Sequence, residues 1–89
     1  MKKIELNGKI IEVASTIDAL GLFCPMPIVK LKVGLEGVDR GAVVELLADD
    51  PGVLEDVPAW CKETNNKFLS IKENKEGIFV AYVEKQQEE

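Results

Sequence analysis

The chain has 89 residues, 46% of them hydrophobic, and a formal net charge of −5. This length fits one domain with a single core and leaves no room for a second domain. The acidic charge argues against direct nucleic-acid binding, which relies on a basic surface. Because the chain contains no histidine, a Cys–His nucleophile pair, an imidazole base and a histidine-bound metal are all excluded.

The chain carries no sign of export or of a membrane anchor. Its N-terminus lacks the apolar run of a signal peptide, and no segment approaches the roughly 18 apolar residues of a membrane span. The two cysteines, Cys24 and Cys61, are too few for a disulfide framework or a four-cysteine zinc site. We therefore expect a cytoplasmic protein with no cofactor, no metal and no membrane contact.

The first predicted element is a β-hairpin. Asn7-Gly8 is typical of a two-residue type I′ turn, and strands are predicted on either side of it over 2–6 and 9–13. A separate short strand is predicted over 16–20, and Gly21 ends it.

A helix is predicted from Pro25 to about Gly37, because its apolar residues recur with the helical period. Prolines suit the first turn of a helix. The apolar stripe expected to pack on the sheet consists of Ile28, Leu31, Leu35 and Val38. A second stripe, on nearly the opposite side, consists of Met26, Val29 and Val33. The second stripe either completes the core under the hairpin or forms an exposed docking surface.

Cys24 stands immediately before this helix and is the candidate reactive residue. As the N-cap it would hold its thiol near backbone N–H groups and the positive end of the helix dipole, which favours the thiolate. Pro25 and Pro27 have no N–H, so the unpaired donors of the first turn reduce to Met26 and Ile28. The dipole alone contributes about 0.3–1 kcal/mol, which is less than about one pKa unit. Burial as a small hydrophobic residue is the competing interpretation.

The rest of the sheet is predicted from β-branched and aliphatic runs. A central strand is expected over 41–48, and a closing hairpin with strands over 68–73 and 78–84. The polar residues 85–89 are expected to form a frayed tail.

The second predicted helix has Asp50 as its N-cap and Pro51 at its first position, and runs to about Asn66. Pro58 lies inside this span. Because an internal proline disrupts a helix, we expect a kink there, or a short opening turn followed by a new start capped by Asp56.

One face of this second helix carries Val57, Trp60, Cys61 and Thr64. Their spacing predicts a core-facing side. We therefore interpret Cys61 as a buried packing residue, and a resolving thiol that reaches Cys24 is the alternative.

These elements predict an α/β two-layer sandwich. It consists of a mixed four-stranded sheet with two helices on one face, plus an added N-terminal β-hairpin. The strand–helix–strand unit predicts a right-handed parallel crossover.

Two motifs give the chain a family resemblance. The first runs from Asp18 to Pro27 and contains Cys-Pro-Met-Pro, and the second runs from Ala48 to Cys61. In this order they resemble the TusA/SirA-type family of small sulfur carriers, over Thr16 to about Val83. The resemblance implies a single TusA/SirA-like domain over 1–89, with an extra hairpin at 1–14, the family core at 16–84 and the tail at 85–89.

The chain departs from the better-characterised carriers next to its cysteine. Phe23 stands where an arginine often precedes the cysteine, and Met26 where a glutamate often separates the two prolines. Both positions border the sulfur, so they bear on which donor and acceptor are used.

The resemblance implies a sulfurtransferase that holds a sulfane sulfur as a persulfide on Cys24 and relays it to an acceptor protein. The donor would be a cysteine desulfurase, a rhodanese-like protein or a small sulfane-sulfur compound. Two groups of residues would assist. Those supporting the sulfur are Pro25, Met26, Pro27 and Ile28, and the candidates for partner docking are Val29, Val33, Asp49 and Asp50. Asp50 also fits the role of a helix cap.

Two other functions stay open. In the first, Cys24 and Cys61 form a reversible disulfide that senses oxidants, which needs their α-carbons within roughly 7 Å. In the second, the thiol is incidental and the chain is a regulatory protein-interaction module.

Overall fold

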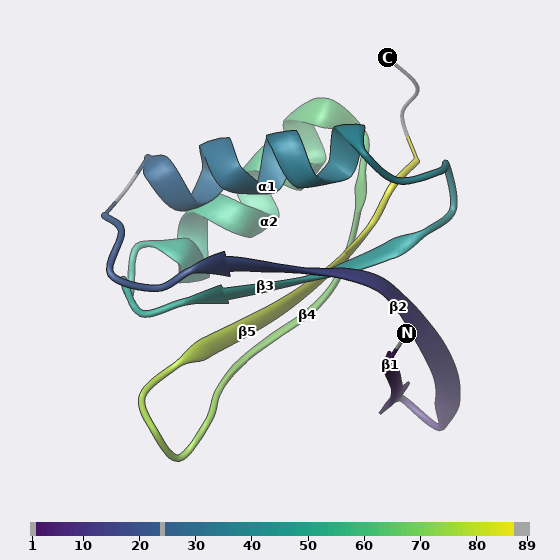
Figure 1. The fold of residues 1–89 in the computed structure, drawn as a ribbon, viewed down its shortest axis with the longest axis horizontal. Coiled ribbons are helices and arrows are strands. Elements are labelled where there is room, and N and C mark those ends of the chain that lie inside the picture. The colour runs from purple at the N-terminus through teal and green to yellow at the C-terminus, as the bar shows by residue number, and fades with distance from the viewer. Residues whose placement is uncertain (1, 24, 87–89) are drawn as a thin grey trace.

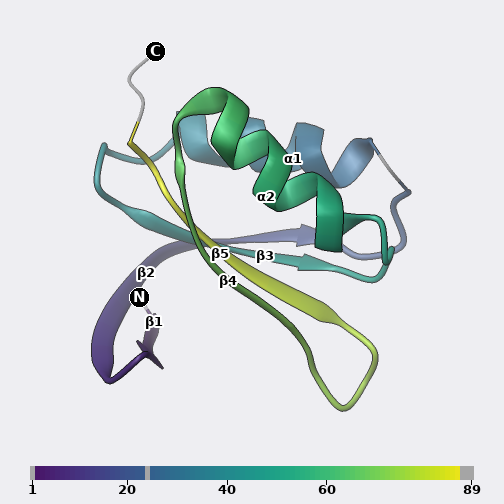
Figure 2. The same cartoon turned by 180° about the vertical axis from the view of Figure 1, so that it is seen from behind.

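The computed structural model describes residues 2–23 and 25–86. Two helices lie next to each other over one face of a curled sheet (Figure 1), and the view from behind shows the same two layers (Figure 2). The helices are α1 (Met26–Glu36) and α2 (Val53–Thr64). The strands are β1 (Lys2–Leu6), β2 (Lys9–Ala19), β3 (Val43–Ala48), β4 (Lys67–Glu73) and β5 (Phe79–Glu84).

The sheet has five strands in the order β1-β2-β3-β5-β4, so the expected four-stranded sheet with a separate hairpin is wrong. The difference arises in β2, which is one continuous strand of 11 residues. Its register against β3 shifts between Val13 and Ser15. An irregularity of this kind bends a strand without ending it, so the hairpin and the first core strand are joined.

The connections between the first three strands follow the predicted pattern. Asn7 and Gly8 have φ values of 53° and 81°, as the type I′ turn of the β1–β2 hairpin requires. β2 and β3 are parallel and are connected through α1, whereas β5 is antiparallel to both β3 and β4. The mixed sheet is therefore confirmed.

The main core lies between the helices and the sheet. Its fully buried side chains include Leu31, Val44, Val57 and Val83. Gly34 lets α1 approach β2 closely, because a Cβ at this position would collide with the end of the Ile17 side chain. This close packing fixes α1, and with it the start of the helix, relative to the strand that precedes it.

The second helix begins later than predicted. Its N-cap is Gly52 and not the predicted Asp50. The Asp50 carboxylate instead accepts the Gly52 N–H at 3.1 Å, in a turn that precedes the helix. α2 then continues through Pro58 to Thr64 as one helix, so no second start at Asp56 exists. A proline removes one backbone hydrogen bond, and helices in proteins are held mainly by packing, here of Val57 and its neighbours against the core.

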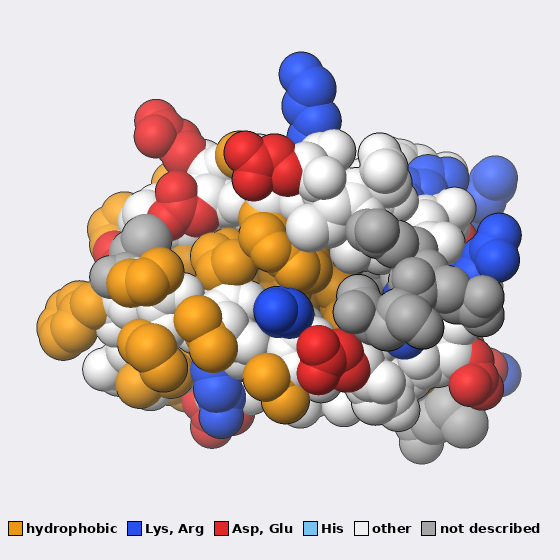
Figure 3. Space-filling model, turned by 90° about the horizontal axis from the view of Figure 1, so that it is seen from above, with side chains coloured by type: hydrophobic (Ala, Val, Ile, Leu, Met, Phe, Trp, Pro, Cys, Tyr) orange, Lys and Arg blue, Asp and Glu red, His pale blue; other side chains and the backbone are white. Residues whose placement is uncertain are grey.

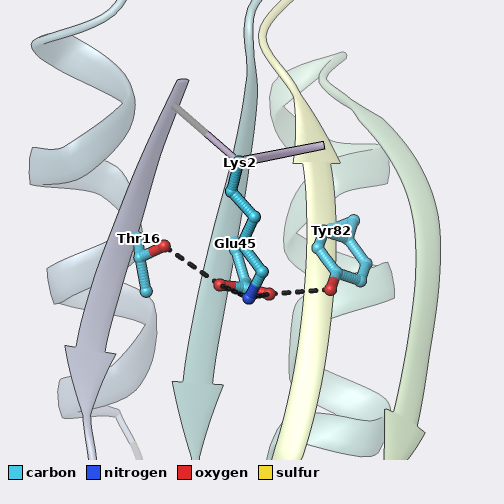
Figure 4. Close-up of polar contacts among 4 residues, drawn as sticks. All are labelled: Lys2, Thr16, Glu45 and Tyr82. Carbon is cyan, nitrogen blue, oxygen red and sulfur yellow. Dashed lines mark hydrogen bonds and ion pairs between the residues drawn. The ribbon is translucent and has the colours of Figure 1, made fainter. Parts of the chain in front are cut away.

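The N-terminal hairpin curls beneath the face of the sheet that carries no helix (Figure 1). Glu45 of β3, which is 2% exposed, lies on this face. Lys2 of β1 donates to it at 2.9 Å, Thr16 of β2 at 3.0 Å and Tyr82 of β5 at 2.7 Å (Figure 4). The hairpin therefore both extends the sheet and covers part of its helix-free face.

The environment of Glu45 favours the ionised carboxylate. Burial raises the pKa of Glu45, but hydrogen bonds from Tyr82, Lys2 and Thr16 and the positive charge of Lys2 outweigh it, so the pKa lies below its ordinary value. The contact between Tyr82 and Glu45 also affects Tyr82. Burial, the hydrogen bond to Glu45 and the negative charge of Glu45 all raise the pKa of the Tyr82 phenol. Four strands thus converge on one buried charge.

The end of β5 is tied to the rest of the fold. Lys85 is buried, and its ammonium group donates to the Val38 carbonyl at 3.0 Å. The backbone N–H of Lys85 donates to Ala42 at 2.8 Å. Residues 87–89 of the predicted tail lie outside the described residues. Within the described ranges, no helix is both long enough and apolar enough to span a membrane.

Candidate functional site

The predicted reactive residue, Cys24, lies outside the described residues. Its neighbours in the chain, Phe23 and Pro25, are described and are both exposed. α1 begins at Met26 with Pro25 as its N-cap, so the predicted N-cap is displaced by one residue. Cys24 therefore joins the loop after β2 to the residue that caps α1.

The first turn of α1 uses its own backbone donors. The Met26 N–H donates to the Phe23 carbonyl at 2.8 Å, and the Ile28 N–H donates to the Pro25 carbonyl at 3.0 Å. The expectation that these two N–H groups are unpaired is therefore wrong, because the carbonyls of Phe23 and Pro25 accept them at the start of the helix. Electrostatic support for an anion at this end rests on the helix dipole, about 0.3–1 kcal/mol.

The loop that leads to Cys24 is held by two carboxylates. The Leu20 N–H donates to Asp18 at 3.0 Å. The Gly21 N–H donates to both carboxylate oxygens of Asp49, at 3.2 and 3.1 Å. Gly21 has a φ of 78°, a conformation that glycine adopts at little cost. The loop is thus attached to the end of β3 through Asp49.

From the sequence, Asp49 and Asp50 are candidates for docking and Asp50 is also the predicted helix cap, whereas their bonds to the Gly21 and Gly52 amides are not predicted. A signal existed, because Ala19 pairs with Ala48 at the end of the parallel β2–β3 ladder. The next residue after each strand must then lie close to the other. Asp50 is half-buried and bonded to Gly52, which agrees with a local role at the start of α2 although it is not the N-cap.

The second apolar stripe of α1 is exposed. Met26 is 45% exposed, Val29 44% and Val33 61%, so the interpretation that this stripe completes the core is wrong. Sequence reasoning did not include Phe23, the most exposed large hydrophobic residue of this region at 77%. Phe23, Met26, Val29 and Val33 are called the apolar surface below. From above, hydrophobic side chains gather at this end of the molecule (Figure 3).

Pro27 and Ile28 anchor this helix instead of facing solvent. Pro27 is buried, and Ile28 packs against the core. The apolar surface therefore lies at the start and along the outer side of α1, whereas Pro27 and Ile28 hold the opposite side of the helix start against the core.

Cys61 is a poor candidate for a reactive thiol. It is 1% exposed, as the core-facing helix pattern predicts, and burial raises the pKa of its thiol to about 11. Cys61 lies eight residues after Val53, the first residue of α2, which corresponds to about 12 Å along the helix axis at about 1.5 Å per residue. Such a thiol carries almost no thiolate at neutral pH, which disfavours the redox-switch interpretation. Its separation from Cys24 falls outside the described residues.

The described residues hold no group of three or more metal-ligating side chains of the histidine, cysteine, aspartate or glutamate type.

Comparisons with known proteins agree on one family. Residues 15–85 match the family described as sulfurtransferase TusA. A Halobacterium salinarum protein provisionally named a sulfur carrier is 32% identical over 74 residues, 83% of this chain and 91% of that protein. The sulfur carrier protein TusA of Allochromatium vinosum is 40% identical over 57 residues, 64% of this chain and 75% of that protein.

Solved structures agree with the fold. The crystal structure of a SirA-like protein from Desulfitobacterium hafniense superposes with a TM-score of 0.71 at 26% identity. The alignment covers 82% of this chain and 99% of that one.

Proposed function

Because the chain belongs to the TusA family, we propose that it is a sulfur carrier that holds a sulfane sulfur as a persulfide on Cys24. It then relays this sulfur to an acceptor protein. The observation that supports the proposal is the match of residues 15–85 to the TusA family. Within the matched residues, the Cys-Pro-Met-Pro sequence leads into the start of α1. A sulfur-carrier role is the function that the names of the relatives support.

The proposed reaction consists of two exchanges at sulfur. The Cys24 thiolate attacks the outer sulfur of a donor persulfide, the donor S–S bond breaks, and the donor leaves as a thiolate. An acceptor thiolate then attacks the outer sulfur of the Cys24 persulfide and releases the Cys24 thiolate. Each step forms one S–S bond and breaks one, so no external oxidant or reductant is consumed.

Both steps depend on the fraction of thiolate and on access. The dipole of α1 favours the anion modestly, and the chain contains no histidine to act as a base. Partners must therefore reach the sulfur directly, which suits a residue whose neighbours Phe23 and Pro25 are both exposed. Pro25, Met26, Pro27 and Ile28 act by building the helix start.

The apolar surface is the proposed docking site for the donor and the acceptor. Val29 and Val33 lie on it, and Asp49 and Asp50 lie at the end of β3 where the cysteine loop is attached. Removal of this apolar area from water contributes binding energy, and nearby carboxylates favour a partner with a basic rim. The donor is a cysteine desulfurase, a rhodanese-like protein or a small sulfane-sulfur compound, in the reducing cytoplasm.

Mass spectrometry after exposure to a cysteine desulfurase with cysteine, or to thiosulfate or polysulfide, tests the proposal. We expect one added sulfur atom on Cys24 that a reductant removes. The Cys24→Ser variant should gain none, and the Cys61→Ser variant should gain the same sulfur as the wild type. An adduct on Cys61, or none with any of these donors, would overturn the proposal.

The interaction-module alternative predicts a different result. A Cys24→Ser variant that keeps full activity in the cell would favour a protein that acts through its surface alone. The apolar surface is compatible with both functions, so this variant separates them.

A further inference from the structure

We propose that Asp49 is a positioning residue for Cys24, because its carboxylate accepts the Gly21 N–H and so attaches the loop that leads to this cysteine to the end of β3. This inference rests on the proposed function of Cys24 as the sulfur carrier. Asp49 is not assigned a part in the exchange itself, since it binds a backbone N–H three residues before the cysteine.

The hydrogen bonds of the loop divide into local and long-range ones. The Leu20 N–H donates to Asp18, two residues earlier, and the Leu22 N–H donates to Ala19 at 3.3 Å. These bonds shape the turn but do not attach it to another element. The bonds from Gly21 to Asp49 join residues 28 positions apart and attach the loop to β3.

The sheet explains why Asp49 can reach this amide. β2 and β3 run in parallel, and their ladder ends at the pair Ala19 and Ala48. The chain then turns away from β2 through Gly21, whose φ of 78° is unfavourable for other residues. Asp49 accepts the N–H of that same residue, so the turn is held by its conformation and by a carboxylate together.

Asp49 binds the amide of Gly21, three residues before Cys24, so its negative charge is expected to disfavour the Cys24 thiolate while its oxygens hold the loop. A nearby negative charge raises the pKa of a thiol, and Asp18 adds a second carboxylate on the neighbouring amide. Three more carboxylates belong to residues 50–56, which follow Asp49: Asp50 ahead of α2, and Glu55 and Asp56 in its first turn. Asparagine at position 49 keeps an acceptor oxygen and removes the charge, whereas alanine removes both.

The experiment compares Asp49→Asn, Asp49→Ala and a charge control, Glu55→Gln, in the full chain. The first readout is the hydrogen exchange of the Gly21 amide by NMR. We expect it to be about tenfold faster in Asp49→Ala, the factor that corresponds to about 1.4 kcal/mol, and within about threefold of wild type in the other two variants.

The second readout is the pH dependence of Cys24 alkylation by iodoacetamide, followed by mass spectrometry. The thiol pKa should fall in both Asp49 variants, because a negative charge is removed. Transfer of sulfur to an acceptor should be about tenfold slower in Asp49→Ala than in Asp49→Asn, because both variants lack the charge proposed for docking and only asparagine keeps the acceptor oxygen for the Gly21 N–H. A urea titration confirms that each variant remains folded at the assay concentration.

Failure of this inference and failure of the proposed function give different results. If Gly21 exchange and Cys24 alkylation in Asp49→Ala match the wild type, Asp49 does not position the loop. If both change as expected while the wild type forms no persulfide, Asp49 positions the cysteine and the carrier function is wrong.

Discussion

Replacement of Lys2 by methionine should destabilise the protein through a single buried carboxylate. The Lys2 ammonium donates to both oxygens of Glu45, at 3.1 and 2.9 Å, and Glu45 is 2% exposed. Methionine keeps most of the apolar stem but removes the charge and the donors. Glu45 then remains buried with only the hydroxyl groups of Thr16 and Tyr82 as its hydrogen-bond donors in this cluster.

The expected loss follows from the exposure of the two partners. A hydrogen bond to a charged group contributes about 1.5–3 kcal/mol to stability. The Lys2 side chain is 58% exposed, so solvent screening places this pair in the lower part of that range. We expect Lys2→Met to lower the free energy of unfolding by about 2 kcal/mol, which corresponds to a fall in Tm on the order of 10 °C for a domain of this size.

The pH dependence gives the prediction a sign. The folded-state pKa of Glu45 lies below its ordinary value of 4.5, so its contribution to stability is present above about pH 4.5 and is lost as the pH falls through the lower folded value. Lys2 contributes only while Glu45 is ionised. The difference between wild type and variant should therefore be constant from about pH 6 to 8 and shrink below about pH 4.5.

Urea unfolding followed by the fluorescence of Trp60 measures the loss. Lys3→Met is the matched control, because Lys3 is the neighbouring lysine of the same strand and pairs with Glu12 across the hairpin. It should cost less than about 0.5 kcal/mol, as most surface substitutions do. Equal losses in the two variants, or a loss in Lys2→Met that persists at low pH, would refute the role of the Glu45 pair.

Three further outcomes follow from the helices. Val33→Asp should slow sulfur transfer to an acceptor about tenfold and leave Cys24 alkylation unchanged. The control Ile10→Asp changes an apolar residue of the hairpin that is 69% exposed, and it should affect neither rate. Stopped-flow transfer and alkylation assays compare the two variants, and equal effects on transfer would refute the docking role of the apolar surface. Cys61 should resist iodoacetamide in the native protein and react only on unfolding, because its thiol is buried with a pKa of about 11; rapid labelling at pH 8 would contradict this. Pro58→Ala should raise the free energy of unfolding by about 1 kcal/mol in urea titrations, because alanine restores a backbone donor inside α2, and a loss would show that the proline ring is needed for packing.

The sequence predicts those parts of the fold that depend on local signals. The Asn7-Gly8 turn fixes the β1–β2 hairpin, and the helical period separates the buried Leu31 and Leu35 from the exposed Val29 and Val33. These features need no knowledge of distant contacts. The core-facing position of Cys61 was predictable for the same reason.

The features that sequence reasoning missed depend on contacts between distant residues. Whether β2 breaks or bends near Ala14 depends on its pairing with β3, so the strand prediction ended too early. Whether Asp50 caps α2 depends on the turn that Gly52 adopts. In the sequence, Glu45 is a charged residue within an apolar strand, and nothing local explains it. Its partners Lys2, Thr16 and Tyr82 come from three other strands, so only the fold shows them.

The candidate site shows the same division. A cysteine beside two prolines at a helix start is visible in the sequence, but the partners of the surrounding amides are not. Because Met26 and Ile28 donate to carbonyls, direct amide contacts from this turn cannot be assumed to activate the sulfur. The attached loop and the exposed apolar surface are the features of this end that the described residues support. A carrier that must both accept and release sulfur does not need a thiolate of very low pKa, because such a thiolate is a weaker nucleophile.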